Sequence, residues 1–303
     1  MVCLSKVEMR KDAKQTSRPN RSSSVAPLRP TAREKSSSVT NKGQAGVLKP
    51  HEPVDQTLSC RYEIKYYVSE SMARALAGFV QAHLPFDRYC KARQGKAYPI
   101  VSLYLDSHNL QLCRESLEGH KNRFKLRIRS YTDDPNYPLF FEIKRRLNSI
   151  IIKDRARVKH RDVASLISGL SLPPYDYSTD HEALKQFQLY VNSINAAPVI
   201  KIRYMREAYE DDSHNRVRVT FDRQLAFKTG STSDVLFNDP HWQDHPGGSV
   251  IVETKFTDHY PAWLHQMVSI FNLRQQSVSK YARSIERSCM LKFCAPKVPA
   301  RFF

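Results

Sequence analysis

Apolar and polar residues alternate along most of the chain from Cys60 onward, with Tyr, Phe, Ile and Val recurring at alternate positions. A period of two is typical of β-strands that bury one face. The predicted strands cover residues 61–68, 100–106, 122–131, 139–146, 149–158, 199–209, 216–222 and 250–256. Eight strands are enough to close a β-barrel.

Five segments between these strands show helical spacing of their apolar residues. The predicted helices cover residues 69–82, 109–117, 162–167, 180–195 and 261–271. Ser69 is expected to cap the first helix, and Pro261 is expected in the first turn of the last. The helices separate groups of strands and do not alternate with them one for one. We therefore expect an α+β fold, an antiparallel eight-stranded β-barrel with helices packed on the outside.

The two ends of the chain differ in composition from this central part. Residues 1–57 are rich in Ser, Pro, Lys and Arg and poor in aromatic residues, so they are expected to form a disordered basic tail. One domain is expected over 58–290, followed by a short tail over 291–303. The basic tail is either a solvated linker or a docking segment for a protein partner, a membrane or nucleic acid.

The charge balance favours anionic partners, because 48 Lys and Arg residues face 30 Asp and Glu residues, a net charge of +18. Nucleic acid, an anionic membrane and polyphosphate all meet this condition. The start of the chain lacks the apolar region of a signal peptide, and no stretch approaches the roughly 18 apolar residues of a membrane span. A soluble, cytoplasmic protein is expected. The six cysteines show no CxxC spacing, which indicates reduced thiols and not a zinc site.

Charges within the strands show which residues share a face, because residues two apart in a strand point the same way. Lys125, Arg127 and Arg129 share one face of their strand, while Leu126 and Ile128 share the other. The same spacing groups Glu63 with Lys65, Glu142 with Lys144 and Arg146, Lys153 with Arg155 and Arg157, Arg216 with Arg218, and Glu253 with Lys255. Six strands therefore carry a charged face.

These charged faces are either solvated or turned into a basic barrel interior. Solvated faces usually interleave both signs, whereas Lys and Arg dominate here. A crowd of enclosed cations is unfavourable unless a dense anion enters, and a mixture of Arg and Lys suits an extended phosphate chain. Leu126 and Ile128, and not stacking aromatic residues, interleave the main basic strand, so no specific nucleic acid is expected.

The recurring glutamates are candidate ligands for Mg²⁺ or Mn²⁺, which bind through one or two carboxylates plus phosphate oxygens. Glu253 is the predicted metal ligand. Glu63 and Glu142 are expected to hold neighbouring Lys and Arg side chains in place. The scattered histidines, His241 and His245 among them, receive no role.

Nine segments, in content and in order, resemble the polyphosphate polymerase domain of the vacuolar transporter chaperone (VTC) family, within the triphosphate tunnel metalloenzymes. The resemblance covers residues 58–287. The segments are RYEIKYYV (61–68), SLYLDS (102–107), KLRIRSY (125–131), FFEIKRRLN (140–148), IIIKDRARV (150–158), YMREAYE (204–210), VRVTFD (217–222), VIVETKF (250–256) and SKYARSIE (279–286).

The resemblance implies a basic tunnel that binds ATP, inorganic phosphate and polyphosphate, with a divalent metal on a glutamate. Carried over position by position, it implies as phosphate ligands Lys65, Arg127, Arg129, Lys144, Lys153, Arg206, Arg218 and Lys280. It implies Arg127, Arg129, Lys144 and Lys255 as cofactor-binding residues, a divalent metal (Mn²⁺ or Mg²⁺) as the cofactor, and Glu253 as the metal ligand. Arg206 has the opposite strand parity to Lys201 and Arg203, so those two are expected to face outward or pack on the surface.

Two departures from the family pattern bear on the reaction. Arg61 stands where related hydrolases and cyclases carry the first glutamate of an ExExK strand, which favours the polymerase type. Ser277 stands where the polymerase pattern has a lysine, which is expected to weaken phosphate binding or alter which end of the chain is held. The expected reaction is transfer of the ATP γ-phosphoryl group to a polyphosphate end. A triphosphate hydrolase of the same fold and a non-catalytic polyanion-binding module stay open as alternatives.

Overall fold

A computed structural model describes residues 62–293, apart from 95, 149, 169–179, 212–215, 231 and 258. All described residues belong to one unit, 54–303. The predicted basic tail over 1–57 and residues 294–303 of the predicted C-terminal tail lie outside the described residues. The predicted limits of the domain therefore stay predictions.

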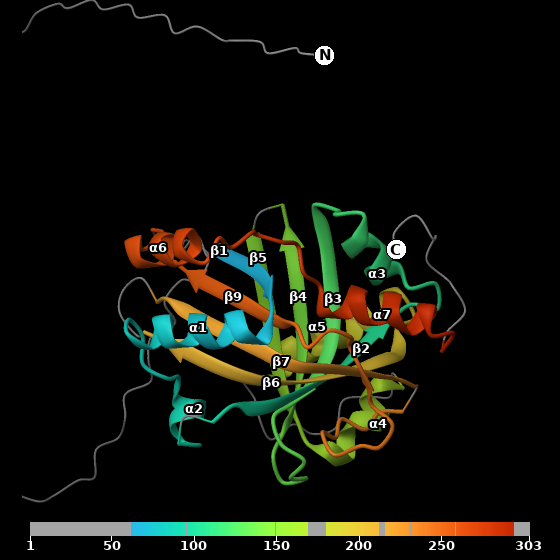
Figure 1. The fold of residues 1–303 in the computed structure, drawn as a ribbon. Coiled ribbons are helices and arrows are strands. Elements are labelled where there is room, and N and C mark those ends of the chain that lie inside the picture. The colour runs from blue at the N-terminus through green and yellow to red at the C-terminus, as the bar shows by residue number, and fades with distance from the viewer. Residues whose placement is uncertain are drawn as a thin grey trace, which may run out of the picture. The chain divides into compact units, whose positions relative to one another are not determined.

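One antiparallel sheet of nine strands forms the centre of this unit (Figure 1). Its strands are β1 (Tyr62–Val68), β2 (Tyr98–Asp106), β3 (Asn122–Ser130), β4 (Leu139–Leu147), β5 (Ile150–Val158), β6 (Ala197–Glu210), β7 (Arg218–Thr229), β8 (Gln243–Asp244) and β9 (Val250–Phe256). Their order is β1-β9-β7-β6-β2-β3-β4-β5, with β8 on β7. The predicted α+β class with an antiparallel sheet is confirmed.

The sheet curves round until its two ends meet through side chains. Nζ of Lys144 on β4 lies 3.6 Å from the carboxylate of Glu63 on β1, although these strands are far apart in the sheet order. In the described part of the chain, no strand pairing joins β1 to β5. The barrel is thus rolled up as predicted, but backbone hydrogen bonds do not close it. We call the sheet face that carries Lys125, Arg127 and Arg129 the inner face.

Seven α-helices lie around the sheet in the described residues. They are α1 (Glu70–Gln81), α2 (Arg88–Lys91), α3 (Gln111–Leu117), α4 (Val163–Ile167), α5 (His181–Ser193), α6 (Ala262–Ile270) and α7 (Lys280–Met290). The hydroxyl of Ser69 accepts a hydrogen bond from the amide of Met72 at 3.2 Å, so the predicted cap of α1 is confirmed. Pro261 is the N-cap of α6 and does not lie in its first turn as predicted.

Two apolar layers cover the outer face of the sheet. Leu76 of α1 and Met267 of α6 pack in one buried cluster with Val252 of β9. Phe187 of α5 packs in a second cluster with Phe141 of β4, the two rings 4.9 Å apart. Burial of these side chains supplies the main driving force for folding. It also leaves the charged residues of the strands on the inner face, as expected.

Helix α7 was not predicted, and it covers part of the inner face. Tyr281 of α7 stacks on Tyr104 of β2 at 4.8 Å, and Ile285 belongs to the same buried cluster as Ile251 of β9. Ile251 lies two residues before Glu253 and therefore points to the same side of β9. The helix thus brings its first residue, Lys280, to the charged part of the sheet.

Strand β7 differs from its prediction at both ends. Arg216 precedes the strand with φ 41°, so it does not share a strand face with Arg218 as predicted. The strand continues to Thr229 because Gln224, with φ 53°, interrupts the alternation without ending the pairing with β6. The segment between β7 and β9 contains the short strand β8.

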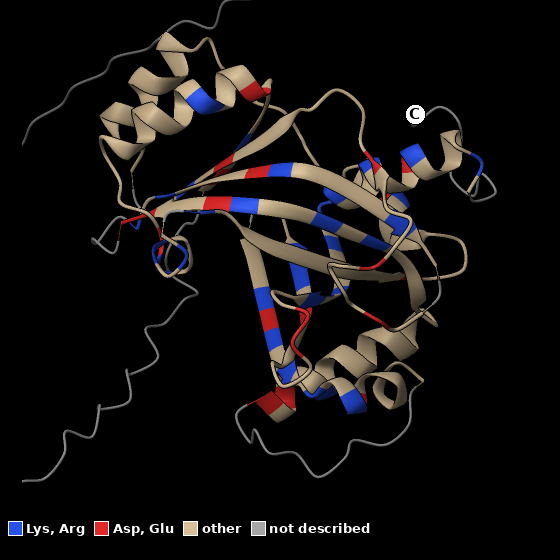
Figure 2. Ribbon diagram, turned by 60° about the horizontal axis from the view of Figure 1, so that its bottom comes forward, with Lys and Arg blue, Asp and Glu red and all other residues tan. Residues whose placement is uncertain are grey.

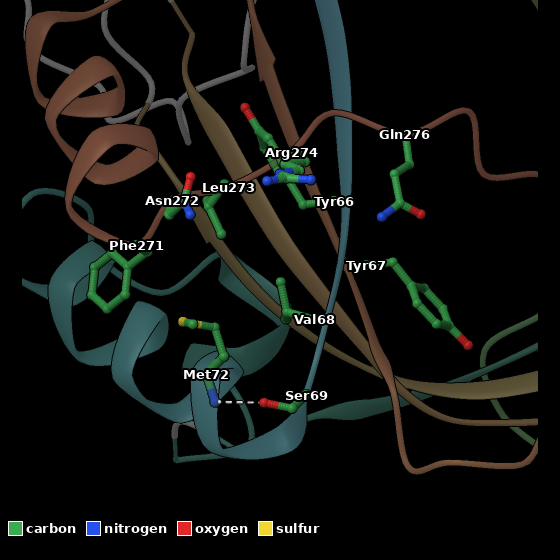
Figure 3. A pocket seen from close by; sticks show the side chains of 10 residues that line it. All are labelled: Tyr66, Tyr67, Val68, Ser69, Met72, Phe271, Asn272, Leu273, Arg274 and Gln276. Carbon is green, nitrogen blue, oxygen red and sulfur yellow. Dashed lines mark hydrogen bonds between the residues drawn. The ribbon is translucent and has the colours of Figure 1, made fainter.

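The free edge of β1 is met by the segment between α6 and α7 (Figure 3). The amide of Gln276 donates to the carbonyl of Lys65 at 2.9 Å, and Gln275 forms an isolated bridge with Tyr66. A hollow of about 300 Å³ lies beside this contact, bordered by Met72 and Phe271 among others.

Two further findings concern the described residues only. Among the described cysteines, Cys90, Cys113 and Cys289 form no disulfide. None of the helices in the described ranges has both the length and the apolar content that a membrane crossing requires.

Candidate functional site

Three lysines stand side by side on the inner face. Lys125 of β3 lies directly opposite Lys144 of β4, which lies opposite Lys153 of β5. We call these three residues the lysine row. Like charges directly opposite each other destabilise a sheet, so this register is unfavourable without a counter-ion. Figure 2 shows the Lys and Arg bands that cross these strands.

The surroundings of the lysine row disfavour its positive charge. Burial, together with repulsion from Lys144 and Lys65, lowers the pKa of Lys125 to about 7. Partial burial and repulsion from Lys255 and Lys144 lower the pKa of Lys153 to about 7. Burial also lowers the pKa of Lys144 to about 8, against an opposing effect of Glu63.

The protein itself supplies little compensation for these charges. Lys125 donates to the hydroxyl of Ser279 at 2.8 Å, and Lys144 reaches the Glu63 carboxylate only at 3.6 Å. Lys153 has no ion pair within the described ranges. An anion bound at the lysine row would relieve this repulsion.

An arginine cluster, Arg127, Arg129 and Arg155, lies next to the lysine row and shares one carboxylate, Glu142, which offsets only part of its positive charge. Glu142 contacts Arg127 at 2.6 Å, Arg155 at 3.2 Å and Arg129 at 3.7 Å. Burial raises the pKa of Glu142, but the three guanidinium groups outweigh it and bring the pKa down to about 2. Glu142 thus holds neighbouring basic side chains, as the sequence suggested.

Glu63 of β1 and Glu253 of β9 form a pair of carboxylates, in addition to Glu142, on the strands that face the lysine row. Glu253 lies opposite Lys65, and Glu63 lies opposite Lys255. Glu253 contacts Lys255 at 2.8 Å and Lys65 at 3.4 Å, and Glu63 contacts Lys65 at 2.7 Å. Burial works against ionisation of Glu253, but these lysines hold its pKa well below the usual range. Both carboxylates are therefore ionised at neutral pH.

This pair fits the divalent metal that the family resemblance implies. Glu253 lies close enough to Glu63 for its charge to act against the ionisation of Glu63 and raise that pKa. One or two carboxylates are the usual protein contribution to an Mg²⁺ site that phosphate oxygens complete. Over the described part of the chain, no group of three or more His, Cys, Asp or Glu residues could hold a metal. Glu63 is therefore the neighbour that could share the metal with Glu253.

Asp222 is a site residue that was missing from the sequence-based prediction. Its carboxylate accepts two hydrogen bonds from Arg206, each 2.7 Å, and contacts Nζ of Lys280 at 2.6 Å. Burial opposes ionisation, but Arg206 and Lys280 bring the pKa of Asp222 down to about 2. Asp222 follows Arg218 by four residues in the same strand, so the alternation along β7 could have placed both side chains on one face.

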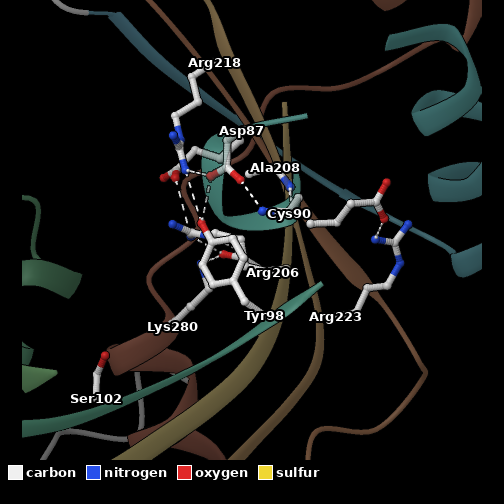
Figure 4. A network of polar contacts seen from close by, with 12 residues as sticks. Asp87, Cys90, Tyr98, Ser102, Arg206, Ala208, Arg218, Arg223 and Lys280 are labelled. Carbon is white, nitrogen blue, oxygen red and sulfur yellow. Dashed lines mark hydrogen bonds and ion pairs between the residues drawn. The ribbon is translucent and has the colours of Figure 1, made fainter. Parts of the chain in front are cut away.

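Arg218 belongs to a polar network at the end of the inner face (Figure 4). It contacts Asp87 at 2.8 Å and the hydroxyl of Tyr98 at 3.2 Å, and it is ion-paired with Glu210. The same Asp87 side chain caps α2 by accepting from the amides of Tyr89 and Cys90. The loop and helix before β2 therefore fix the position of Arg218.

The structure brings all the predicted site residues to the inner face. These are Lys65, Arg127, Arg129, Lys144, Lys153, Arg206, Arg218, Lys255, Lys280 and Glu253. Lys125 was recognised as sharing this face but was not included among the ligands. Lys201 and Arg203 point outward as expected, yet Lys201 is buried and contacts Asp239 at 3.1 Å. Arg203 packs on the rings of Phe237 and Trp242.

Several solved structures share similarity with the chain. A candidate adenylate cyclase from Bacillus halodurans is 13% identical with a TM-score of 0.42, over 73% of this chain and 95% of that one. The PH1819 protein from Pyrococcus horikoshii is 14% identical with a TM-score of 0.40, over 76% and 99%. A candidate adenylyl cyclase from Hippeastrum with a dominant triphosphatase activity is 14% identical with a TM-score of 0.42, over 74% and 95%.

Comparison with curated proteins finds no match. Comparison with protein families finds the VTC domain, which matches residues 60–289. This range contains every strand and helix described above except the last residue of α7. The chain therefore belongs to the VTC domain family.

Proposed function

We propose that this chain is a polyphosphate polymerase, which transfers the γ-phosphoryl group of ATP to the end of a phosphate or polyphosphate chain. The lysine row carries the proposal. Three lysines in register, with depressed pKa values and little protein compensation, suit a ligand with several closely spaced negative charges. Membership of the VTC domain family supports the same class of ligand.

In this proposal the basic groups orient the phosphates and stabilise charge. Lys144 and Lys153 bind the oxygens of one phosphate chain as mobile point charges, and Arg127 and Arg129 offer planar donors to the next phosphate. Arg206 and Lys280, held by Asp222, complete the opposite side. Phosphoryl transfer needs mainly such positioning and charge stabilisation.

The transfer breaks the bond between the γ-phosphorus and its bridging oxygen, so that ADP leaves, and forms a bond to a terminal oxygen of the acceptor. The acceptor oxygen is already anionic, so no residue is assigned as a general base. A divalent metal, when bound at Glu253 with Glu63 beside it, would supply further neutralisation of the phosphoryl oxygens. We infer Mn²⁺ or Mg²⁺ from the oxygen-only donor set.

Two other functions use the same inner face. A hydrolase would pass the phosphoryl group to water, and a binding module would hold polyphosphate without turnover. Arg61, in place of the first glutamate of the ExExK strand of related hydrolases, favours the polymerase over the hydrolase.

The test incubates the purified 303-residue chain with ATP and Mn²⁺ or Mg²⁺, and resolves the products on a gel stained for polyphosphate. Long products that an exopolyphosphatase digests are expected. The variants Glu253→Gln and Lys153→Met should each lose on the order of 10²-fold in rate. Lys185→Met, on the exposed side of α5, is the matched control. Orthophosphate without chains would indicate the hydrolase, and tight polyphosphate binding without turnover would indicate the binding module.

A further inference from the structure

Four aromatic side chains lie together at the end of the inner face, and none of them is among the residues proposed to bind phosphate or metal. They come from four separate elements: Tyr89 from α2, Tyr98 from β2, Tyr131 after β3 and Phe140 from β4. We call these four residues the aromatic cluster. Sequence spacing within one strand could not reveal it, because each element contributes a single ring.

The rings form a continuous surface. The ring centroids of Tyr89 and Tyr98 lie 5.5 Å apart, those of Tyr98 and Tyr131 6.5 Å, and those of Tyr131 and Phe140 5.6 Å. Tyr89 and Tyr131 are nearly parallel, with an interplanar angle of 3° and a centroid distance of 6.4 Å. Tyr98 is buried, but Tyr89 is 41% exposed. Part of the cluster is therefore open to a ligand.

Guanidinium groups lie on this surface. Arg155 lies 3.7 Å from the ring centroid of Phe140 and donates to the hydroxyl of Tyr131 at 3.0 Å. Arg88 lies 4.7 Å from the ring centroid of Tyr89 and donates to its hydroxyl at 2.7 Å. Alternating aromatic faces and guanidinium planes are the surface on which nucleobases stack.

The aromatic cluster is continuous with the residues proposed to bind phosphate. The hydroxyl of Tyr98 lies 3.2 Å from Arg218, as Figure 4 shows for the network around it. Tyr131 follows Arg129 by two residues, and Phe140 lies directly opposite Arg129 in the sheet. A ligand with a planar base at one end and a chain of phosphates at the other matches the aromatic cluster and the basic residues that adjoin it.

We propose that the aromatic cluster binds the base of a nucleoside triphosphate whose phosphates lie along the inner face, with Tyr89 as its open stacking surface. The inference rests on the proposed function, because it names the part of the donor that the phosphate-binding groups leave unassigned. The one carboxylate bonded to Tyr98 of the cluster, that of Asp87, is buried and paired with Arg218, so the base is held by its flat face and not by its edge. Different bases should therefore bind with similar affinity.

The experiment compares two ligands that share a triphosphate and differ in the base. Dissociation constants of the full chain are measured by calorimetry for ATP and for inorganic tripolyphosphate, in a buffer without divalent metal so that nothing turns over. Tyr89→Ala should weaken ATP binding on the order of 10-fold, the loss of one stacked base. Tripolyphosphate binding should stay within about twofold, because its charge contacts are untouched.

Two further variants serve as controls. Tyr89→Phe keeps the ring and should restore ATP binding. Tyr137→Ala removes a tyrosine that is 55% exposed, between β3 and β4 and outside the aromatic cluster, and should change neither constant. GTP and CTP should have dissociation constants similar to that of ATP, both in the wild type and in Tyr89→Ala.

The outcomes separate this inference from the proposed function. Equal weakening of ATP and tripolyphosphate by Tyr89→Ala, or no weakening of either, would overturn the base site while leaving the phosphate site intact. A single-stranded oligonucleotide that binds through Tyr89 more tightly than ATP would also overturn it, in favour of a nucleic-acid surface. Failure of the wild type to bind either triphosphate would overturn the proposed function itself.

Discussion

Asp222 shows how strongly single residues are coupled on the inner face. It has no exposed surface, and it is in contact with Arg206 and Lys280, which come from a neighbouring strand and a distant helix. An enclosed ion pair adds little net stability, because desolvation offsets its attraction. Removal of its carboxylate is nevertheless costly, because enclosed cations are left uncompensated. Removal of Asp222 would leave two enclosed cations without their partner.

Asp222→Asn should therefore lower the free energy of unfolding by about 3–5 kcal/mol, the usual result of breaking an enclosed ion pair. Urea denaturation at neutral pH measures this loss. Asp154→Asn removes a partly exposed partner of Arg145 at 2.6 Å and should cost about 1 kcal/mol or less. An equal decrease in the free energy of unfolding in the two variants would contradict the inference that Asp222 compensates two enclosed cations.

The depressed pKa of Lys125 leads to a pH dependence of stability. Below about pH 7 this lysine is charged in both the folded and the unfolded chain, and the folded chain bears the full repulsion. Between about 7 and 10.5 the folded chain loses the proton first, so the free energy of unfolding should rise with pH. Lys153 contributes less because its side chain is exposed and solvent screens it.

Lys125→Met should remove part of this rise, by less than about 1.4 kcal/mol per pH unit. Urea denaturation of the wild type and the variant at pH 6, 7.5 and 9 measures it. Binding of tripolyphosphate should respond in the opposite direction, weakening as the pH rises through 7 to 8, because the anion requires charged lysines. Parallel stability curves for the two proteins would show that Lys125 does not titrate in this range.

At the scale of elements, α7 is joined to the lysine row by its cap. The hydroxyl of Ser279 accepts from the amide of Ala282 at 3.2 Å, which caps the helix, and also from Nζ of Lys125 at 2.8 Å. Ser69 caps α1 in the same manner, but on the outer side of the sheet. The two serines thus share one structural role and differ in their surroundings.

Ser279→Ala and Ser69→Ala should each lower the free energy of unfolding by about 1 kcal/mol, the usual cost of losing a serine cap. Only Ser279→Ala should also change the affinity for tripolyphosphate, because only this change leaves Lys125 without its hydroxyl partner. Calorimetric titration of both variants gives the comparison. An equal change of affinity in both would mean that a general loss of stability is responsible.

The elements that the sequence predicts well are those with regular alternation. The strand containing Lys125, Arg127 and Arg129 follows the period of two without interruption, and β3 forms where expected. Helix α7 was missed because its apolar residues are few, and its burial depends on Tyr104 of β2, far away in the sequence. The place of Gln224 inside a strand was missed because a positive φ is set by the pairing with β6 and not by local preference.

The site was predicted to the same extent. Residues on one strand, such as Lys125 and Arg127, could be assigned to a common face by parity. The register of Lys125 with Lys144 and Lys153 could not, because it depends on how three strands slide relative to each other. The alternation along β7 could have placed Asp222 on the face of Arg218, but its contacts with Arg206 and Lys280, like the aromatic cluster, join elements that no single-strand pattern encodes.

At the scale of the whole domain, the excess of positive charge makes stability depend on anions. Tripolyphosphate that binds only the folded chain should raise the free energy of unfolding by about 2.7 kcal/mol at a concentration one hundred times its dissociation constant. Thermal unfolding with increasing tripolyphosphate measures the shift. The double variant Lys144→Met, Lys153→Met should show a smaller shift, whereas Lys185→Met should behave as the wild type.

High salt should reduce this stabilisation in the wild type, because exposed charges are screened within about 8 Å at physiological ionic strength. A shift that does not change between low and high salt would mean that tripolyphosphate binds by other contacts. The same result in the double variant and the wild type would place the anion away from the lysine row.

The way the sheet ends meet bears on how the proposed polyphosphate ligand would enter and leave. A barrel that is closed by backbone hydrogen bonds all the way round admits a polymer only by threading it in from one end. Here the contact of Lys144 with Glu63 spans the seam, and Gln275 and Gln276 meet the free edge of β1. Parting such a seam breaks a few local contacts and no complete ladder of strand hydrogen bonds. A long polyphosphate of the kind proposed above would therefore enter the barrel from the side, through the opened seam. It would leave by the same route, without its whole length being drawn through the barrel.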